Sequence, residues 1–141
     1  HKAANVASTW PTINGAWWPN GLTSDASFFL NAVDNTIWIH FVHRGLAYLI
    51  ALIVILWTAS LNSIHLNGFW NKAKWIPLIL VLVQVVLGVL TVLTSKWIVP
   101  GTWAAFEWFA QLHQLVGMLL VLSVVLILYM TSIKQSAVQS V

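Results

Sequence analysis

The chain consists of a polar, turn-rich segment followed by three long apolar runs. The runs extend over residues 37–61, 75–95 and 104–131. Each is at least as long as the roughly 20 residues that a helix needs to cross the hydrocarbon core of a bilayer. Because a backbone in lipid must satisfy its own hydrogen bonds, such runs form helices. The pattern predicts an all-α integral membrane protein with three transmembrane helices.

Residues 1–36 carry the turn signals of Pro11, Pro19 and two Asn-Gly pairs, which prevent a long helix. Trp10, Trp17 and Trp18 are interleaved with these turns, as is typical of a loop at the membrane interface. The alternative is an ordinary polar tail with chance aromatic residues. We therefore divide the chain into an extracytoplasmic interfacial loop at 1–36, a membrane bundle at 37–134 and a C-terminal tail at 135–141.

Composition supports the membrane class. The 141 residues are 60% hydrophobic and only 6% charged, which is too little charge to coat a soluble globule. A disordered chain would be polar and highly charged. The six Lys and Arg residues are scattered and form no stripe for a nucleic-acid backbone. Since the chain has no Cys, disulfides and thiolate metal sites are excluded.

Basic residues in the short loops predict the orientation. Lys72 and Lys74 lie between the first two runs and Lys134 follows the third, whereas the 96–103 loop has only Lys96. In the first segment, the positive charge of Lys2 is outweighed by the negative charges of Asp25 and Asp34. The positive-inside rule places the 62–74 loop and the C-terminus in the cytoplasm or matrix, with the N-terminal loop outside. We expect a bacterial plasma membrane or a mitochondrial inner membrane.

Two histidines lie inside different runs, His43 in the first and His113 in the third. The first and third helices would run in the same direction, which places both side chains at similar depth in the outer half of the membrane. Two imidazoles facing each other are what a haem iron with two axial histidines requires. The alternative is a pair of histidines that hydrogen-bond neighbouring helices or line a water cavity. A copper or zinc site would require more ligands than two histidines, and a proton relay would require carboxylates.

Two neighbours of His43 are further candidates. His40 lies three residues earlier on the same helix face, either beside the ligand or simply at the interface. Arg44 is a permanent charge within the run, for which a haem propionate would be a suitable partner. Alternatively, Arg44 extends to the headgroups or pairs with Glu107.

Other polar and small residues receive structural interpretations. Gln84 and Gly88 form one face of the second helix, more typical of helix packing than of chemistry. Glu107 lies in the first turn of the third helix, where a carboxylate interacts favourably with the helix dipole. Gly117, one turn from His113, and less decisively Ala47, one turn from His43, would let a flat macrocycle approach the backbone. His65 has no evident partner in the sequence.

Three motifs occur in order: a Trp-Pro-Thr-Ile-Asn-Gly-Ala-Trp-Trp-Pro loop at 10–19, His40-Phe41-Val42-His43-Arg44, and Leu112-His113-Gln114. Together they resemble the second half of the haem A synthase family, over nearly the whole chain. That family has eight spans in two similar four-helix halves and oxidises a methyl group of haem O to the formyl group of haem A.

The resemblance implies that His43 and His113 are the axial iron ligands of a haem b, with Arg44 and His40 also contributing to cofactor binding. It implies a bundle that lacks one helix, and a missing N-terminal half of the same protein. The implied partners are membrane lipid, haem O as substrate, haem O synthase and the terminal oxidase assembly. No nucleic acid is expected. The family's first half has Glu at the position matching His40, so we expect this chain to bind cofactor without being active by itself.

Two other interpretations remain. One is a non-catalytic cytochrome b module whose bis-histidine haem only transfers electrons. The other is a transport or assembly protein whose histidines pack helices and bind no haem.

Overall fold

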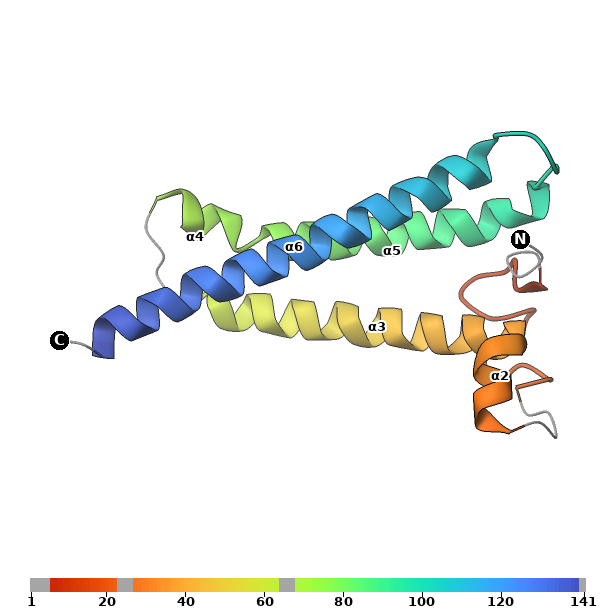
Figure 1. Ribbon diagram of the computed structural model, residues 1–141, viewed down its shortest axis with the longest axis horizontal. Coiled ribbons are helices and arrows are strands. Elements are labelled where there is room, and N and C mark those ends of the chain that lie inside the picture. The colour runs from red at the N-terminus through yellow and green to blue at the C-terminus, as the bar shows by residue number, and fades with distance from the viewer. Residues whose placement is uncertain (1–5, 23–26, 64–67, 140–141) are drawn as a thin grey trace.

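The computed structural model describes residues 6–22, 27–63 and 68–139 (Figure 1). Its helices are α2 (Phe28–Asp34), α3 (Thr36–Leu61), α4 (Phe69–Ala73), α5 (Ile76–Thr94) and α6 (Ala105–Gln139), with a 3₁₀ turn η1 at Ser95–Trp97. The predicted all-α architecture is confirmed. Lys2, Asp25 and His65, which entered the sequence interpretation, lie outside the described residues.

Local capping explains where the long helices begin. The side chain of Asn35 accepts a hydrogen bond from the Trp38 amide at 3.2 Å, which caps α3. Pro77 lies in the first turn of α5, where its missing N–H is not needed. At the start of α6, Glu107 Oε2 accepts a hydrogen bond from the Ala104 amide at 2.8 Å. The structural role predicted for Glu107 is therefore confirmed.

Three helices are long and apolar enough to cross a membrane: Thr36–Leu61, Phe69–Trp97 and Ala105–Ser132. Only 11% of the most apolar window of each is buried inside the protein. Many Leu, Ile and Val side chains of these helices are therefore exposed, which is unfavourable in water but favourable in lipid. The predicted integral membrane class is confirmed.

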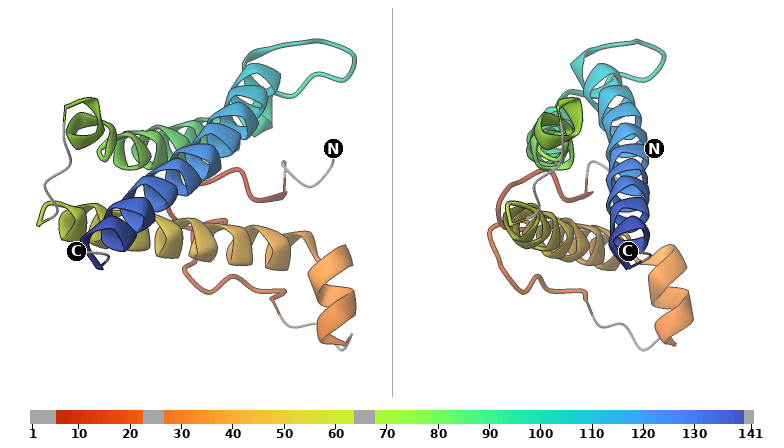
Figure 2. Two further views of the ribbon diagram at one scale, coloured as in Figure 1. Left: turned by 60° about the vertical axis from the view of Figure 1, so that its left-hand side comes forward. Right: turned by 90° about the vertical axis from the view of Figure 1, so that its left-hand side faces the viewer.

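The three long helices stand at the corners of a triangle when viewed end on (Figure 2). α5 and α6 make the most extensive contact, and α3 packs more sparsely on α5. The N-terminal segment and the loop after η1 lie at one end of the bundle, whereas α4 and the end of α6 lie at the other (Figure 1). α3 and α6 thus run in the same direction with α5 returning between them.

Two small apolar clusters hold the helices together. Val54 of α3, Val81 of α5 and Leu120 of α6 meet near the middle of the bundle. Leu61, Ala73 and Ile127 form a second cluster where α4 covers the end of α3. Since both clusters lie away from the N-terminal segment, α3 is left free to diverge from the other two helices toward that end.

The N-terminal segment is folded onto the bundle. Asn14 (φ 52°) and Gly15 (φ 87°) form a tight turn closed by reciprocal hydrogen bonds between Ile13 and Ala16, at 3.0 and 3.1 Å. Ala7, Ile13 and Leu22 are buried. The described part of this segment is therefore a folded part of the protein. The short helix α2 was not predicted, and α6 continues through most of the segment expected to be a C-terminal tail.

Candidate functional site

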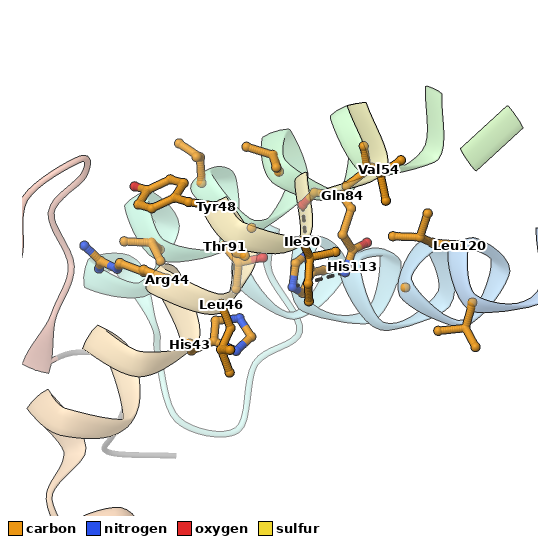
Figure 3. Close-up of a pocket in the computed structure, with 18 of the residues that line it drawn as sticks. His43, Arg44, Leu46, Tyr48, Ile50, Val54, Gln84, Thr91, His113 and Leu120 are labelled. Carbon is orange, nitrogen blue, oxygen red and sulfur yellow. Dashed lines mark hydrogen bonds between the residues drawn. The ribbon is translucent and has the colours of Figure 1, made fainter. Parts of the chain in front are cut away.

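His43 of α3 and His113 of α6 face each other across the bundle (Figure 3). Their ring centroids are 6.3 Å apart and the ring planes are inclined at 64°. The two residues are 70 positions apart in the sequence, so only the parallel course of α3 and α6 brings them together. The two candidates singled out by their depth in the apolar runs are therefore close neighbours.

Both histidines line a cavity of about 660 Å³ between α3 and the α5–α6 pair. This volume is within the range of pockets that hold cofactor-sized ligands. The wall is mostly aliphatic. The polar side chains in it are His40, His43, Arg44, Tyr48, Gln84, Thr91 and His113. His43 is exposed and His113 is half-buried.

His113 is held by α5. Its Nδ1 lies 3.1 Å from the backbone carbonyl oxygen of Gln84, and its Nε2 lies 3.3 Å from Nε2 of the Gln84 side chain. Gln84 and Gly88 do pack α5 against α6, as predicted. The sequence interpretation missed that their packing partner is His113 itself. The signal available was a single amide side chain within an otherwise apolar run.

Two glycines provide the space for this contact. A Cβ at Gly88 would lie 3.1 Å from His113 Cε1, and one at Gly117 would lie 3.0 Å from Gln84 Nε2. Gly117 thus makes room for the Gln84 amide, whereas the sequence interpretation reserved it for a flat macrocycle. Both glycines and Ala47 line the cavity.

Arg44 points away from the histidines, toward the N-terminal segment (Figure 3). Its guanidinium donates to the carbonyl oxygens of Ala7 at 2.7 Å and of Thr12 at 3.1 Å. The residue is only 8% exposed, and its Nε is buried without a hydrogen-bond partner among the described residues. Arg44 is therefore bound by the N-terminal segment and is not paired with Glu107.

The tryptophans of the N-terminal segment have different positions. Trp10 lines the cavity beside Arg44. Trp18 packs edge-on against Phe41, with ring centroids 5.2 Å apart, and Trp17 lines a separate smaller pocket beside α3. Of the three, Trp10 is the one placed to cover the large cavity.

The comparisons with known proteins identify the family. The model of the COX15-CtaA family, described as cytochrome oxidase assembly protein, matches residues 1–125. The chain belongs to this family. The match includes both histidines, Arg44, α3, α5 and the part of α6 up to residue 125, and it bears out the resemblance carried by the three sequence motifs.

Curated relatives in this family are named heme A synthase. The protein of Beijerinckia indica is 34% identical over 84% of this chain and 31% of its own length. That of Pelagibacter ubique is 29% identical over 90% of this chain and 34% of its own length. The chain thus spans about a third of these relatives, and about a quarter of the one from Bartonella tribocorum. No solved structure matches the chain.

The residues present fit a haem iron. Metal–imidazole bonds of about 2 Å place the ring centroids of two axial histidines roughly 6 Å apart, close to the separation seen here. The hydrogen bond at His113 Nδ1 leaves Nε2 as the nitrogen that carries the lone pair, which is how metal-binding histidines are usually oriented. No group of three or more potential metal-ligating side chains is found among the described residues.

Proposed function

We propose that this chain is the C-terminal, haem b-binding part of a haem A synthase, with His43 and His113 as the axial ligands. The observation that carries the proposal is the facing of two imidazoles from parallel membrane helices across an apolar cavity, with centroids 6.3 Å apart. Family membership supports the enzyme as a whole, in which haem O is oxidised to haem A.

The chain's own residues would bind and shield the cofactor. His43 approaches the cavity from α3 and His113 from α6. Arg44 lies at the cavity wall with a buried, unpartnered Nε–H, which is suited to a carboxylate such as a haem propionate. His40 lines the same wall one turn before His43, and Trp10 covers it from the N-terminal segment.

With both axial positions filled by histidine, the bound haem would supply electron transfer rather than oxygen binding. The apolar wall excludes water, which influences the potential at which electrons are transferred. We therefore assign this part of the protein to an electron-relay role that supports the oxidation of haem O elsewhere in the enzyme. Haem O synthase and the terminal oxidase assembly would supply the substrate and consume the product.

Absorption spectroscopy on the whole purified protein tests the haem assignment. We expect a Soret band typical of a six-coordinate, low-spin haem, and its loss or shift in His43→Ala and His113→Ala. A spectrum unchanged in both variants would remove these residues as ligands.

To separate an enzyme from a simple cytochrome, haems are extracted after expression with a source of haem O. Absence of haem A would favour the non-catalytic cytochrome.

A further inference from the structure

One residue of α5 contacts both ring nitrogens of His113. The Gln84 backbone carbonyl lies 3.1 Å from Nδ1, and the Gln84 side-chain amide nitrogen lies 3.3 Å from Nε2. A carbonyl oxygen only accepts hydrogen bonds, so Nδ1 must carry the proton. In a neutral ring Nε2 then has the lone pair, and the amide N–H donates to it. The two contacts together define the tautomer.

The oxygen atom of the Gln84 side-chain amide takes no part in this contact. Oε1 of Gln84 is buried and has no hydrogen-bond partner among the described residues. The Gln84 side chain therefore reaches into an apolar cavity to make its hydrogen bond to His113, and leaves its own oxygen unsatisfied. Flipping the amide would place that oxygen against an unprotonated nitrogen, which is repulsive.

The backbone is shaped for the same contact. His113 faces Gly88 and the Gln84 amide faces Gly117, with distances of 3.1 and 3.0 Å to the Cβ that each glycine lacks. Each large polar group on one helix therefore lies opposite a glycine on the other. This reciprocal arrangement positions the ring and the amide from both sides.

We propose that Gln84 is a positioning residue for haem binding, which prepares His113 and covers its ligating nitrogen until the iron arrives. The backbone carbonyl fixes the proton on Nδ1, and the side-chain amide occupies the place at Nε2 that the metal would take. This inference rests on the proposed function of His113 as an axial ligand. It gives Gln84 two separable actions, one through the backbone and one through the side chain.

The side-chain action competes with the iron. Haem binding must break the amide–Nε2 hydrogen bond, whereas the carbonyl–Nδ1 bond remains. Gln84→Leu removes the competing donor and keeps the backbone carbonyl, so haem affinity should rise about fivefold, the equivalent of one ordinary hydrogen bond. Gln84→Glu should act in the opposite sense, because a carboxylate at Nε2 favours a proton there.

The first experiment is a titration of the haem-free protein in detergent with ferric haem b (haemin), followed at the Soret band. The matched control is Gln111→Leu, the same change at an exposed position on α6 two residues before His113. We expect tighter binding for Gln84→Leu, weaker binding for Gln84→Glu and no change for Gln111→Leu. Equal affinities for all of them would overturn the competition.

The second experiment needs no haem and no change at Gln84. Nitrogen-15 NMR of histidine-labelled, haem-free protein reports which ring nitrogen carries the proton, with the His113 signals assigned by their loss in His113→Asn. We expect Nδ1 protonated and Nε2 unprotonated. A proton on Nε2, alone or on both nitrogens, would overturn the proposal. If the tautomer is as expected but haemin does not bind, the proposed function fails while the role of Gln84 in fixing His113 stands.

Discussion

At the scale of single residues, Arg44 carries the most unusual contacts in the protein. It is a charged side chain inside a membrane helix, and its guanidinium is occupied by two backbone carbonyls of the N-terminal segment. An ionisable side chain in such a position is costly unless it is paired. The N-terminal segment and the arginine therefore stabilise each other.

Replacing Arg44 by Leu should loosen the N-terminal segment. The change removes two charge-assisted hydrogen bonds and leaves the Ala7 and Thr12 carbonyls without their donor, a loss of about 2 kcal/mol. Hydrogen exchange measured by mass spectrometry should rise in residues 6–16 and stay unchanged in α5. Arg44→Lys, which keeps the charge but not the two-pronged geometry, should give an intermediate result. Unaltered exchange in Arg44→Leu would contradict this role.

At the scale of the elements, the α5–α6 contact depends on glycines that make room for polar side chains. Gly88→Ala would place a methyl group 3.1 Å from the His113 ring, which is itself held by two contacts with α5. We expect destabilisation by about 1–2 kcal/mol relative to Gly45→Ala. Gly45 has nothing within 4 Å of its missing Cβ, so this control shares only the helix-propensity gain. Thermal unfolding in detergent measures the difference, and equal midpoints would refute the tight fit.

The second cluster predicts a different contrast on α6. Ile127 is 1% exposed and packs against Leu61 and Ala73, whereas its neighbour Leu126 is 44% exposed. Ile127→Ala should cost about 2 kcal/mol or more, because the cavity left between helices is not refilled. Leu126→Ala should have a much smaller effect, since lipid fills the space. Comparable losses in thermal stability would mean that α6 packs differently.

The elements were more predictable from sequence than the contacts between them. The three membrane helices follow from apolar runs, because lipid imposes length and hydrogen bonding on each run separately. The short helix α2 depends on local caps at Ser27 and Asn35, which no hydrophobic pattern announces. Gln84 and Arg44 illustrate the same limit in the site. Their residue types indicated importance, but their partners lie 29 and up to 37 positions away.

At the scale of the whole molecule, the fold separates two ends. The N-terminal segment and the loop after η1 share one end, and α4 lies at the other (Figure 1). Combined with the basic residues Lys72 and Lys74, this arrangement predicts that α4 faces the cytoplasm or matrix.

Cysteine labelling tests this topology without background, since the chain has no native Cys. Asn14→Cys and Thr102→Cys should react with a membrane-impermeant maleimide from the outer side of intact cells or vesicles. Asn71→Cys should react only after the membrane is opened. Labelling of Thr102→Cys and Asn71→Cys from the same side would be incompatible with the helix order seen here.

The Arg44 contacts also determine how deeply α3 can sit in the bilayer. A simple apolar helix can slide or tilt by several ångströms to match the thickness of the surrounding lipid. α3 is instead tethered, because Arg44 holds a folded polar segment that cannot follow it into hydrocarbon. His43, the adjacent residue, is therefore kept at one level whatever the lipid composition. Because His43 has to face His113 across the bundle, a fixed depth of His43 in the membrane keeps the two side chains opposite each other.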